Sequence, residues 1–343
     1  MATVFVTGSA GFIGFHLCRA LLAEGFRVAG YDGMTPYYDV GLKRARCAIL
    51  SANPAFTQTE AMLEDAAALG AAVRAAAPRV IVHLAAQAGV RHSLEAPRAF
   101  VEANVTGSFN LLEAARTVAP AHLLIASTSS AYGASDRMPF REIDPAEHPL
   151  TVYAATKRAV ELLSHAWAHL HGLPTTLFRF FTVYGSWGRP DMAPMKFLRA
   201  ALAGEPISVH NHGRMRRDFT HVSDIVSAIR LLIDRPPPPP GHRPAPVPGD
   251  TLSPVAPWRL VNIGNGSPVE LGAFIDQLEA ALGRPIARRM VAMQPGEMTA
   301  TWADTGLLRA LTGFTPATPL AEGVAELVAW YRDHYGDAPR GSS

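Results

Sequence analysis

The chain has 343 residues, of which 48% are hydrophobic and 17% charged, a composition typical of a globular protein rather than a disordered one. Its formal net charge of +2 does not by itself indicate binding to nucleic acid or to an anionic membrane. No apolar run approaches the roughly 18 residues that a membrane span needs. We therefore expect a globular protein with neither nucleic acid nor membrane as a partner.

The first residues and the cysteines indicate the cytoplasm. The first eight residues have no basic region and no signal-type cleavage site, which argues against a secretory leader. Two cysteines, Cys18 and Cys47, are too few for a disulfide framework or for a cysteine zinc site. A reducing, cytoplasmic location is therefore expected.

Short apolar strands and amphipathic helices alternate through the first half of the chain. Strands are predicted at 3–7, 27–32, 79–84, 122–127 and 175–180. Helices are predicted between them at 12–23, 66–76, 100–118 and 153–171. Buried strands separated by helices are typical of a parallel sheet covered on both faces. The sequence thus predicts an α/β fold with a doubly wound parallel (Rossmann) sheet.

The pattern changes after about residue 182. Beyond it, proline- and glycine-rich loops separate a strand at 260–263 and short helices at 195–203, 222–233, 268–282 and 320–335. We expect residues 1–182 to form the Rossmann domain, with 219–235 and 258–266 returning to it. Residues 183–339 are expected to form mainly a smaller, irregular α/β domain that binds the substrate.

A proline-rich segment, 235–257, lies within this second part. It contains ten prolines, five of them consecutive at 236–240. A polyproline ligand for a partner protein is one interpretation. A solvated surface insertion is the favoured one, because a predicted helix and a predicted strand bound the segment.

A glycine-rich loop follows the first predicted strand and enters the first predicted helix. In Gly8-Ser9-Ala10-Gly11-Phe12-Ile13-Gly14, the three glycines suit a tight turn, close approach of a pyrophosphate and close helix–strand packing. The backbone N–H groups at the start of that helix would face the anion. Asp32, at the end of the second strand, suits ribose hydroxyls and would repel a 2′-phosphate. NAD is therefore favoured, while Lys43, Arg44 and Arg46 keep NADP as an alternative.

A tyrosine and a lysine four residues apart, Tyr153 and Lys157, share one face of a predicted helix. A phenol with its ordinary pKa of about 10 is a poor base at neutral pH. A nearby ammonium and an oxidised nicotinamide both favour the phenolate. Thr128, at the exit of a strand, can hydrogen-bond to the same reacting hydroxyl. Tyr153, Lys157 and Thr128 are therefore the predicted catalytic residues.

Longer motifs give the chain a family resemblance. They are the glycine loop, the Tyr153–Lys157 pair and the segments 83–91, 179–192 and 214–220. With these, the chain resembles the extended short-chain dehydrogenase/reductase superfamily over nearly its full length, and it is most similar to the UDP-glucuronate 4-epimerases. The resemblance implies a tightly bound, recycled NAD, a UDP-sugar substrate held by the C-terminal domain, and a homodimer formed through two helices of each subunit.

The resemblance also implies a mechanism, the reversible conversion of UDP-glucuronate to UDP-galacturonate. Tyr153 takes the proton of the 4-hydroxyl while hydride passes from C4 to NAD, the 4-keto sugar rotates, and hydride returns to the opposite face. Lys157 binds the nicotinamide ribose, and Thr128 orients the hydroxyl. The further cofactor residues that the resemblance implies are Leu63, Ala85, Ala86, Gln87 and Asn104.

Sibling enzymes differ where the sugar would bind. Related 4,6-dehydratases carry an acidic pair, and related decarboxylases a Glu, where this chain has Ser129 and Ser130. These hydroxyls suit a C6 carboxylate and are too weak to abstract the C5 proton. Thr182 stands where UDP-galactose 4-epimerases commonly have Asn. The three residues favour a uronic acid.

Four charged residues complete the predicted substrate site. Arg91 and Arg189 are cations near the motifs whose guanidinium groups match carboxylate geometry. By resemblance, Arg217 contacts the diphosphate, and Glu297, which replaces the family's more usual Asp, contacts the uridine ribose. Met62 stands where the family usually has Asp against the adenine.

Three alternatives are weaker. His165 and His169 have the spacing of two metal ligands but lack a Glu or Cys partner, so no metal is expected. A 4-epimerase of neutral UDP-hexoses fits the same catalytic residues. A non-catalytic, NAD-binding regulator is disfavoured, because Tyr153, Lys157 and Thr128 are all present.

Overall fold

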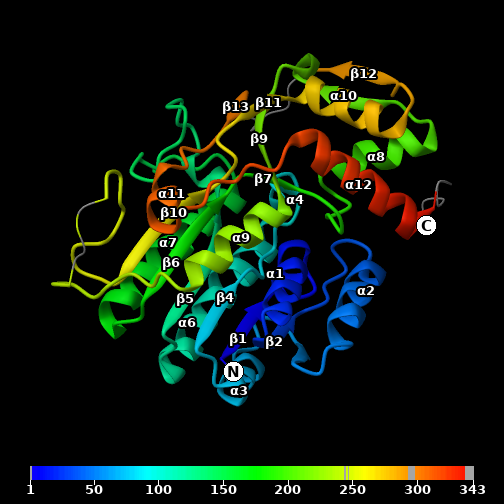
Figure 1. Cartoon of the computed structure of the whole chain (residues 1–343). Coiled ribbons are helices and arrows are strands. Elements are labelled where there is room, and N and C mark those ends of the chain that lie inside the picture. The colour runs from blue at the N-terminus through cyan, green and yellow to red at the C-terminus, as the bar shows by residue number, and fades with distance from the viewer. Residues whose placement is uncertain (1, 243–244, 246, 293–297, 337–343) are drawn as a thin grey trace.

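A seven-stranded parallel sheet forms the centre of the molecule (Figure 1). The computed structural model describes residues 2–242, 245, 247–292 and 298–336. The strand order is β10-β6-β5-β4-β1-β2-β3. The strands are β1 (Thr3–Thr7), β2 (Arg27–Asp32), β3 (Phe56–Glu60), β4 (Val80–His83), β5 (His122–Thr128), β6 (Thr175–Phe180) and β10 (Trp258–Ile263). The predicted doubly wound α/β fold is confirmed.

Helices cover both faces of this sheet because its strands are apolar on both sides. Along β1, Val4 and Val6 pack in the core beneath one set of helices, whereas Phe5 packs in the core beneath the other. The first face carries α1 (Phe12–Ala23), α9 (Val222–Ile233) and α11 (Gly306–Thr312). The second face carries α3 (Ala66–Ala76), α6 (Gly107–Val118) and α7 (Val152–His171).

The order of the strands reverses between β1 and β4. From β1 the chain winds outward through β2 and β3, then returns to β4 on the other side of β1 and continues outward through β5 and β6. A crevice forms at the carboxyl ends of the strands at such a switch point, and ligands of open α/β sheets bind there. The glycine loop follows β1 at this place.

A second group of elements lies beside the carboxyl end of the sheet (Figure 1). Its own apolar core includes Phe219, Phe274 and Leu327. The rings of Phe219 and Phe274 stack with their centroids 4.4 Å apart. Its helices are α8 (Ala193–Ala203), α10 (Leu271–Leu282) and α12 (Leu320–Tyr335). Its strands are β7 (Thr182–Tyr184), β8 (Ile207–His210), β9 (Arg216–His221), β11 (Pro268–Glu270), β12 (Arg288–Val291) and β13 (Ala300–Thr301).

Two predicted helices had wrong bounds, and several elements were not predicted. The helix predicted at 268–282 begins only at Leu271, because residues 268–270 form β11 and pair antiparallel with β9. The helix predicted at 100–118 is three segments, namely α5 (Pro97–Phe100), a π-helical segment Val101–Thr106 and α6. The sequence analysis also missed α2 (Val40–Ser51), β3, α11 and the strands of the second group. It missed three short helical segments as well, namely α4 (His92–Glu95) and the 3₁₀ turns Ser129–Tyr132 and Asn211–Gly213.

The two histidines considered as metal ligands hold the proline-rich insertion against α7. His165 Nε2 lies 2.8 Å from Ser253 Oγ, and His169 Nδ1 lies 2.7 Å from the carbonyl oxygen of Val255. Within the described ranges, no group of three or more His, Cys, Asp or Glu residues is arranged to hold a metal ion. No described helix combines the length and the apolar character needed to cross a membrane.

Candidate active site

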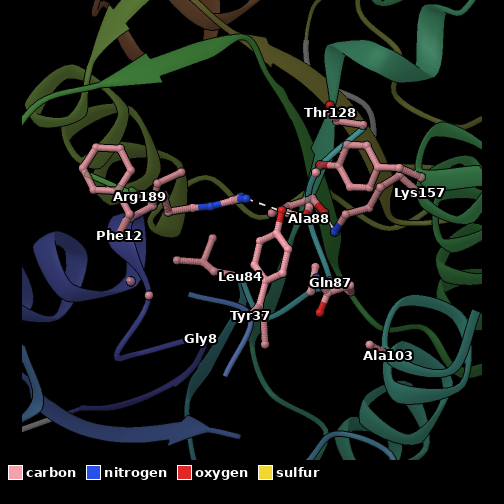
Figure 2. Close-up of a pocket in the computed structure, with 18 of the residues that line it drawn as sticks. Gly8, Phe12, Tyr37, Leu84, Gln87, Ala88, Ala103, Thr128, Lys157 and Arg189 are labelled. Carbon is pink, nitrogen blue, oxygen red and sulfur yellow. Dashed lines mark hydrogen bonds between the residues drawn. The ribbon is translucent and has the colours of Figure 1, made fainter. Parts of the chain in front are cut away.

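A cavity of about 670 Å³ opens at the carboxyl ends of β1, β2, β4 and β5 (Figure 2). It is lined by most of the residues that the sequence analysis singled out. These are Gly8, Gly11, Phe12, Ile13, Gly14, Asp32, Leu63, Ala85, Ala86, Gln87, Thr128, Ser129, Ser130, Tyr153, Lys157, Thr182 and Arg189. The fold therefore brings the glycine loop, the Tyr–Lys pair and the hydroxyl-bearing residues to one place.

The glycine loop is shaped by contacts that leave no room for side chains. Gly8 has φ +72°, and a Cβ atom there would lie 2.8 Å from the backbone nitrogen of Ala85. A Cβ atom on Gly14 would lie 2.0 Å from the carbonyl oxygen of Gly8, so α1 packs directly against the loop. The described part of the chain supplies no side-chain cap to the N-terminus of α1. Its first N–H groups thus suit a pyrophosphate.

Asp32 lies at the end of β2 and is buried at the wall of the cavity. Its carboxylate accepts hydrogen bonds from the backbone N–H groups of Ala10, at 3.1 Å, and Met34, at 2.9 Å. These two bonds orient the carboxylate and leave lone pairs for the hydroxyls of a ribose. A 2′-phosphate at this place would meet a like charge.

The cations that kept NADP as an alternative have other partners. Arg44 makes a two-bond ion pair with Glu60 on the surface. Arg46 is fully buried and donates to backbone carbonyl oxygens. Lys43 lines the cavity, but its ammonium donates to the backbone and side-chain oxygens of Thr35, at 2.9 and 3.1 Å. These contacts favour NAD.

Tyr153 and Lys157 lie on successive turns of α7, whose N-terminus is capped by the side chain of Thr151. Burial raises the pKa of Tyr153, while its hydrogen bond with Thr128 and the charge of Arg189 act in the opposite direction. Burial lowers the pKa of Lys157 to about 8. At neutral pH Lys157 is therefore an ammonium whose proton is held more weakly than usual.

Three hydroxyl-bearing residues face the same cavity as the tyrosine. Ser129 and Ser130 begin the 3₁₀ turn Ser129–Tyr132, where the backbone N–H of Ser130 donates to Thr128 Oγ1 at 3.2 Å. Thr182 begins β7 on a separate strand. The wall beside Tyr153 thus offers several neutral donors, and none of these three side chains is an acid or base of useful strength.

The guanidinium of Arg189 reaches the cavity (Figure 2), and its charge is already partnered by Asp191. Its guanidinium makes two hydrogen bonds to Asp191, and Nη2 lies 3.5 Å from the carbonyl oxygen of Ala88. Tyr37 donates to the same Asp191 carboxylate at 3.0 Å and extends across the cavity toward Arg189. These contacts fix the guanidinium at the cavity wall.

Three predicted site residues in the described part of the chain do not line the cavity. Asn104 is buried and holds the loop after β4 in place, because its side chain bonds to the backbone N–H and C=O of Gln87. Arg91 is exposed, and Arg217 lies on β9 with its guanidinium donating to backbone carbonyls. Glu297 lies outside the described residues.

Several lining residues were missed by the sequence analysis. Thr35, Tyr37 and Tyr38 come from the loop after β2, which carries no recognised motif. Phe181 and Met192 lie within the recognised segment 179–192 but were not singled out. In the loop after β2, the available signal was the aromatic pair at 37–38, a few residues after a predicted strand. Asp191 was within a recognised motif, but its pairing with Arg189 could not be read from the sequence.

Comparison with known proteins agrees with this geometry. Residues 4–242 match the family model described as the NAD dependent epimerase/dehydratase family. The chain belongs to this family. A probable UDP-glucuronate 4-epimerase from Rhizobium meliloti is 54% identical over 331 residues, which cover 96% of this chain and 97% of that protein. The predicted family resemblance is therefore confirmed.

Two further members of the epimerase/dehydratase family are similar over nearly the whole chain. UDP-glucuronate 4-epimerase 1 from Arabidopsis thaliana is 40% identical, with 97% of this chain and 77% of that protein covered. The crystal structure of UDP-glucuronic acid 4-epimerase from Bacillus cereus, in complex with UDP-glucuronic acid and NAD, aligns with a TM-score of 0.85. Its identity is 28%, and 97% of this chain and all of that chain are covered.

Proposed function

We propose that this chain is an isomerase, an NAD-dependent epimerase that converts UDP-glucuronate reversibly to UDP-galacturonate by inverting C4. The observation that carries the proposal is the single cavity in which Tyr153, Lys157 and Thr128 face the glycine loop. The relatives described above are named as UDP-glucuronate 4-epimerases. The Bacillus cereus structure contains both UDP-glucuronic acid and NAD.

The residues of the cavity fit NAD. The glycine loop and the uncapped start of α1 suit the pyrophosphate, and Asp32 suits the adenosine ribose. Leu63, Ala85, Ala86 and Gln87 would line the remaining length of the cofactor. When bound, NAD supplies the acceptor and then the donor of the hydrogen on C4, and it is therefore not consumed.

The chain's own side chains transfer the proton and stabilise the charge that the transfer creates. Tyr153 Oη takes the proton of the 4-hydroxyl as the C4–O bond becomes a carbonyl, and it returns a proton to that oxygen after the sugar has rotated. The ammonium of Lys157 stabilises the phenolate and would bind the nicotinamide ribose. Thr128 orients the reacting hydroxyl through its hydrogen bond with Tyr153.

The remaining polar groups suit the C6 carboxylate of the sugar. Ser129, Ser130 and Thr182 offer hydroxyl donors, and Arg189 offers a guanidinium that Asp191 fixes at the cavity wall. No carboxylate or imidazole stands at positions 129, 130 or 182 to remove the C5 proton, so the uronic acid survives while C4 is a ketone. This arrangement supports epimerisation rather than dehydration or decarboxylation.

In this proposal one domain binds the cofactor and the other mainly binds the substrate. In this proposal residues 1–182, with 219–235 and 258–266, bind NAD, and residues 183–339 mainly bind the UDP group through Arg217 and Glu297. The proposal is supported by β10 and α9, which belong to the central sheet and its covering helices. The separate apolar core around α8, α10 and α12 supports the second domain.

We also propose a homodimer formed through α6 and α7, in the cytoplasm. Phe109 on α6 packs edge-on against Trp167 on α7, and Phe109 on α6 and Leu162 on α7 are exposed apolar side chains. Exposed apolar side chains on adjacent helices are suited to a helical interface. Cys18 and Cys47 are free thiols, as a reducing compartment would keep them.

A direct comparison of two substrates tests the proposed reaction. Protein purified without added cofactor is expected to convert UDP-glucuronate to UDP-galacturonate and to release no carbon dioxide. The catalytic efficiency on UDP-glucuronate should exceed that on UDP-glucose by about 100-fold or more, because a charged group bound by several donors contributes roughly 3 kcal/mol. NMR of the sugar anomeric region identifies both products.

Each other outcome contradicts the proposal in a distinct way. UDP-xylose or a 4-keto pentose would make the protein a decarboxylase. Equal or greater efficiency on UDP-glucose would favour the epimerase of neutral UDP-hexoses. Bound NAD without turnover of either sugar would favour a regulator.

A further inference from the structure

Glu161 is a fully buried carboxylate one helical turn beyond Lys157, and the mechanism above does not use it. Its two oxygens accept four hydrogen bonds. Oε1 accepts from Ser127 Oγ at 2.6 Å and from Arg179 Nε at 2.8 Å. Oε2 accepts from Arg179 Nη2 at 2.7 Å and from Arg158 Nη1 at 2.8 Å. An ionised carboxylate with this many donors is held in one orientation.

Two turns of α7 therefore hold the end of β5. Lys157 Nζ donates to the carbonyl oxygen of Ala126 at 3.0 Å, and Glu161 accepts from Ser127 on the next residue. The residue that follows is Thr128, which lines the cavity with Tyr153 and whose side chain acts to lower the pKa of that phenol. Loss of the Glu161 carboxylate would release one of these two contacts between α7 and the end of β5, at the residue next to Thr128.

Glu161 also supplies a negative charge one helical turn from Lys157 in this buried region. The other charged groups near the carboxylate are Arg179 on β6, fully buried, and Arg158 on α7, partly exposed. Glu161 raises the pKa of Lys157 against the lowering by burial. Without Glu161, the ammonium of Lys157 would share the region with an unpaired guanidinium.

The remaining titratable groups on the surrounding elements do not replace this charge. His83 on β4 is kept neutral, because burial and the charge of Lys157 lower its pKa to about 3. The guanidinium carbon of Arg179 lies 4.3 Å from the centroid of the Tyr132 ring. Burial raises the pKa of Tyr132 and keeps its hydroxyl protonated. Glu142, in the loop after β5, interacts with Arg179 rather than with Lys157, and burial raises its pKa to about 7.

We propose that Glu161 is a positioning residue for the reaction, and that its carboxylate keeps Lys157 in the ammonium form beside Tyr153 and fixes Ser127 next to Thr128. The inference rests on the proposed function only for its effect on catalysis. The charge on Lys157 can be measured without any turnover. The proposed role of Glu161 and the proposed function can therefore be disproved separately.

The sequence offers an unusually direct measurement, because the only lysines are Lys43, Lys157 and Lys196. Protein labelled with ¹³C at the lysine ε-carbon gives three signals, and the one lost in Lys157→Met belongs to Lys157. In Glu161→Gln, the titration midpoint of Lys157 is expected to fall by about one pH unit or more, since removing a nearby opposite charge disfavours the charged form. The alkaline limb of kcat should move to lower pH by a similar amount, and KM should change little.

Arg158→Gln is the matched control. It removes a partly exposed partner of the same carboxylate and leaves the buried charge of Glu161 in place, so the Lys157 midpoint and kcat should stay close to those of the parent protein. If Glu161→Gln does not fold, the double variant Glu161→Met/Arg179→Met replaces the buried pair by apolar side chains, which proteins often tolerate. A smaller downward shift of the Lys157 midpoint is expected there, because the unpaired guanidinium is removed together with the carboxylate. An unchanged Lys157 midpoint in either folded variant overturns the proposal.

Discussion

Replacing Tyr153 with phenylalanine is expected to lower kcat about 1,000-fold or more while NAD stays bound. The substitution removes only the hydroxyl that takes and returns the proton, and a positioned acid–base group typically contributes about 10² to 10⁴ in rate. Thr128 alone cannot replace it, because an alcohol is a far weaker base. The variant should be assayed by the formation of UDP-galacturonate, with its bound NAD measured after denaturation.

Tyr132→Phe is a suitable control for this variant. Tyr132 lies in the turn after β5, but its hydroxyl donates to Asn262 at 2.7 Å in the core and does not line the cavity. Its loss should cost stability and leave kcat within about tenfold of the parent enzyme. Substantial turnover by Tyr153→Phe would remove Tyr153 from the role of base.

Replacing Asp32 with asparagine is expected to weaken NAD binding about 10- to 100-fold, so that the purified variant has lost most of its cofactor. Hydrogen bonds to a charged group contribute roughly 1.5–3 kcal/mol, and an amide has one oxygen where the carboxylate has two. The preference for NAD over NADP should narrow as well, because the repulsion of a 2′-phosphate is removed. Calorimetric titration of the apoprotein with each cofactor measures both effects.

Glu60→Gln controls for the loss of a carboxylate at the same level of the sheet. Glu60 on β3 pairs in register with Asp32 on β2, but its side chain is exposed and bonded to Arg44 outside the cavity. NAD affinity in this variant should match that of the parent protein. Full retention of NAD by Asp32→Asn would show that this carboxylate does not bind the cofactor.

The central sheet could be predicted because most of its strands are continuous apolar runs. β5 is buried at every position, and its pattern is readable without knowledge of its neighbours. β3 has the sequence Phe-Thr-Gln-Thr-Glu at the edge of the sheet, with most side chains at least partly exposed. Its strand conformation depends on pairing with β2, which no local pattern reveals.

The candidate site was predictable where chemistry follows a local motif. The glycine spacing and the Tyr153–Lys157 spacing are short-range patterns, and the three glycines, Tyr153 and Lys157 all line the cavity. Glu161 becomes conspicuous only when β6 pairs with β5 and brings Arg179 beside it. The pairing of Tyr37 with Asp191 joins residues 154 positions apart. Such contacts are products of the fold and are absent from any local pattern.

The fate of the hydrogen on C4 tests the central claim most directly. UDP-glucuronate carrying deuterium at C4 should be incubated with the protein as purified, without added NAD, and the product examined by NMR and mass spectrometry. Inversion within one cavity predicts UDP-galacturonate that keeps deuterium at C4 in nearly every molecule. Exchange of the label with solvent, or its appearance in a decarboxylated pentose, would contradict that mechanism.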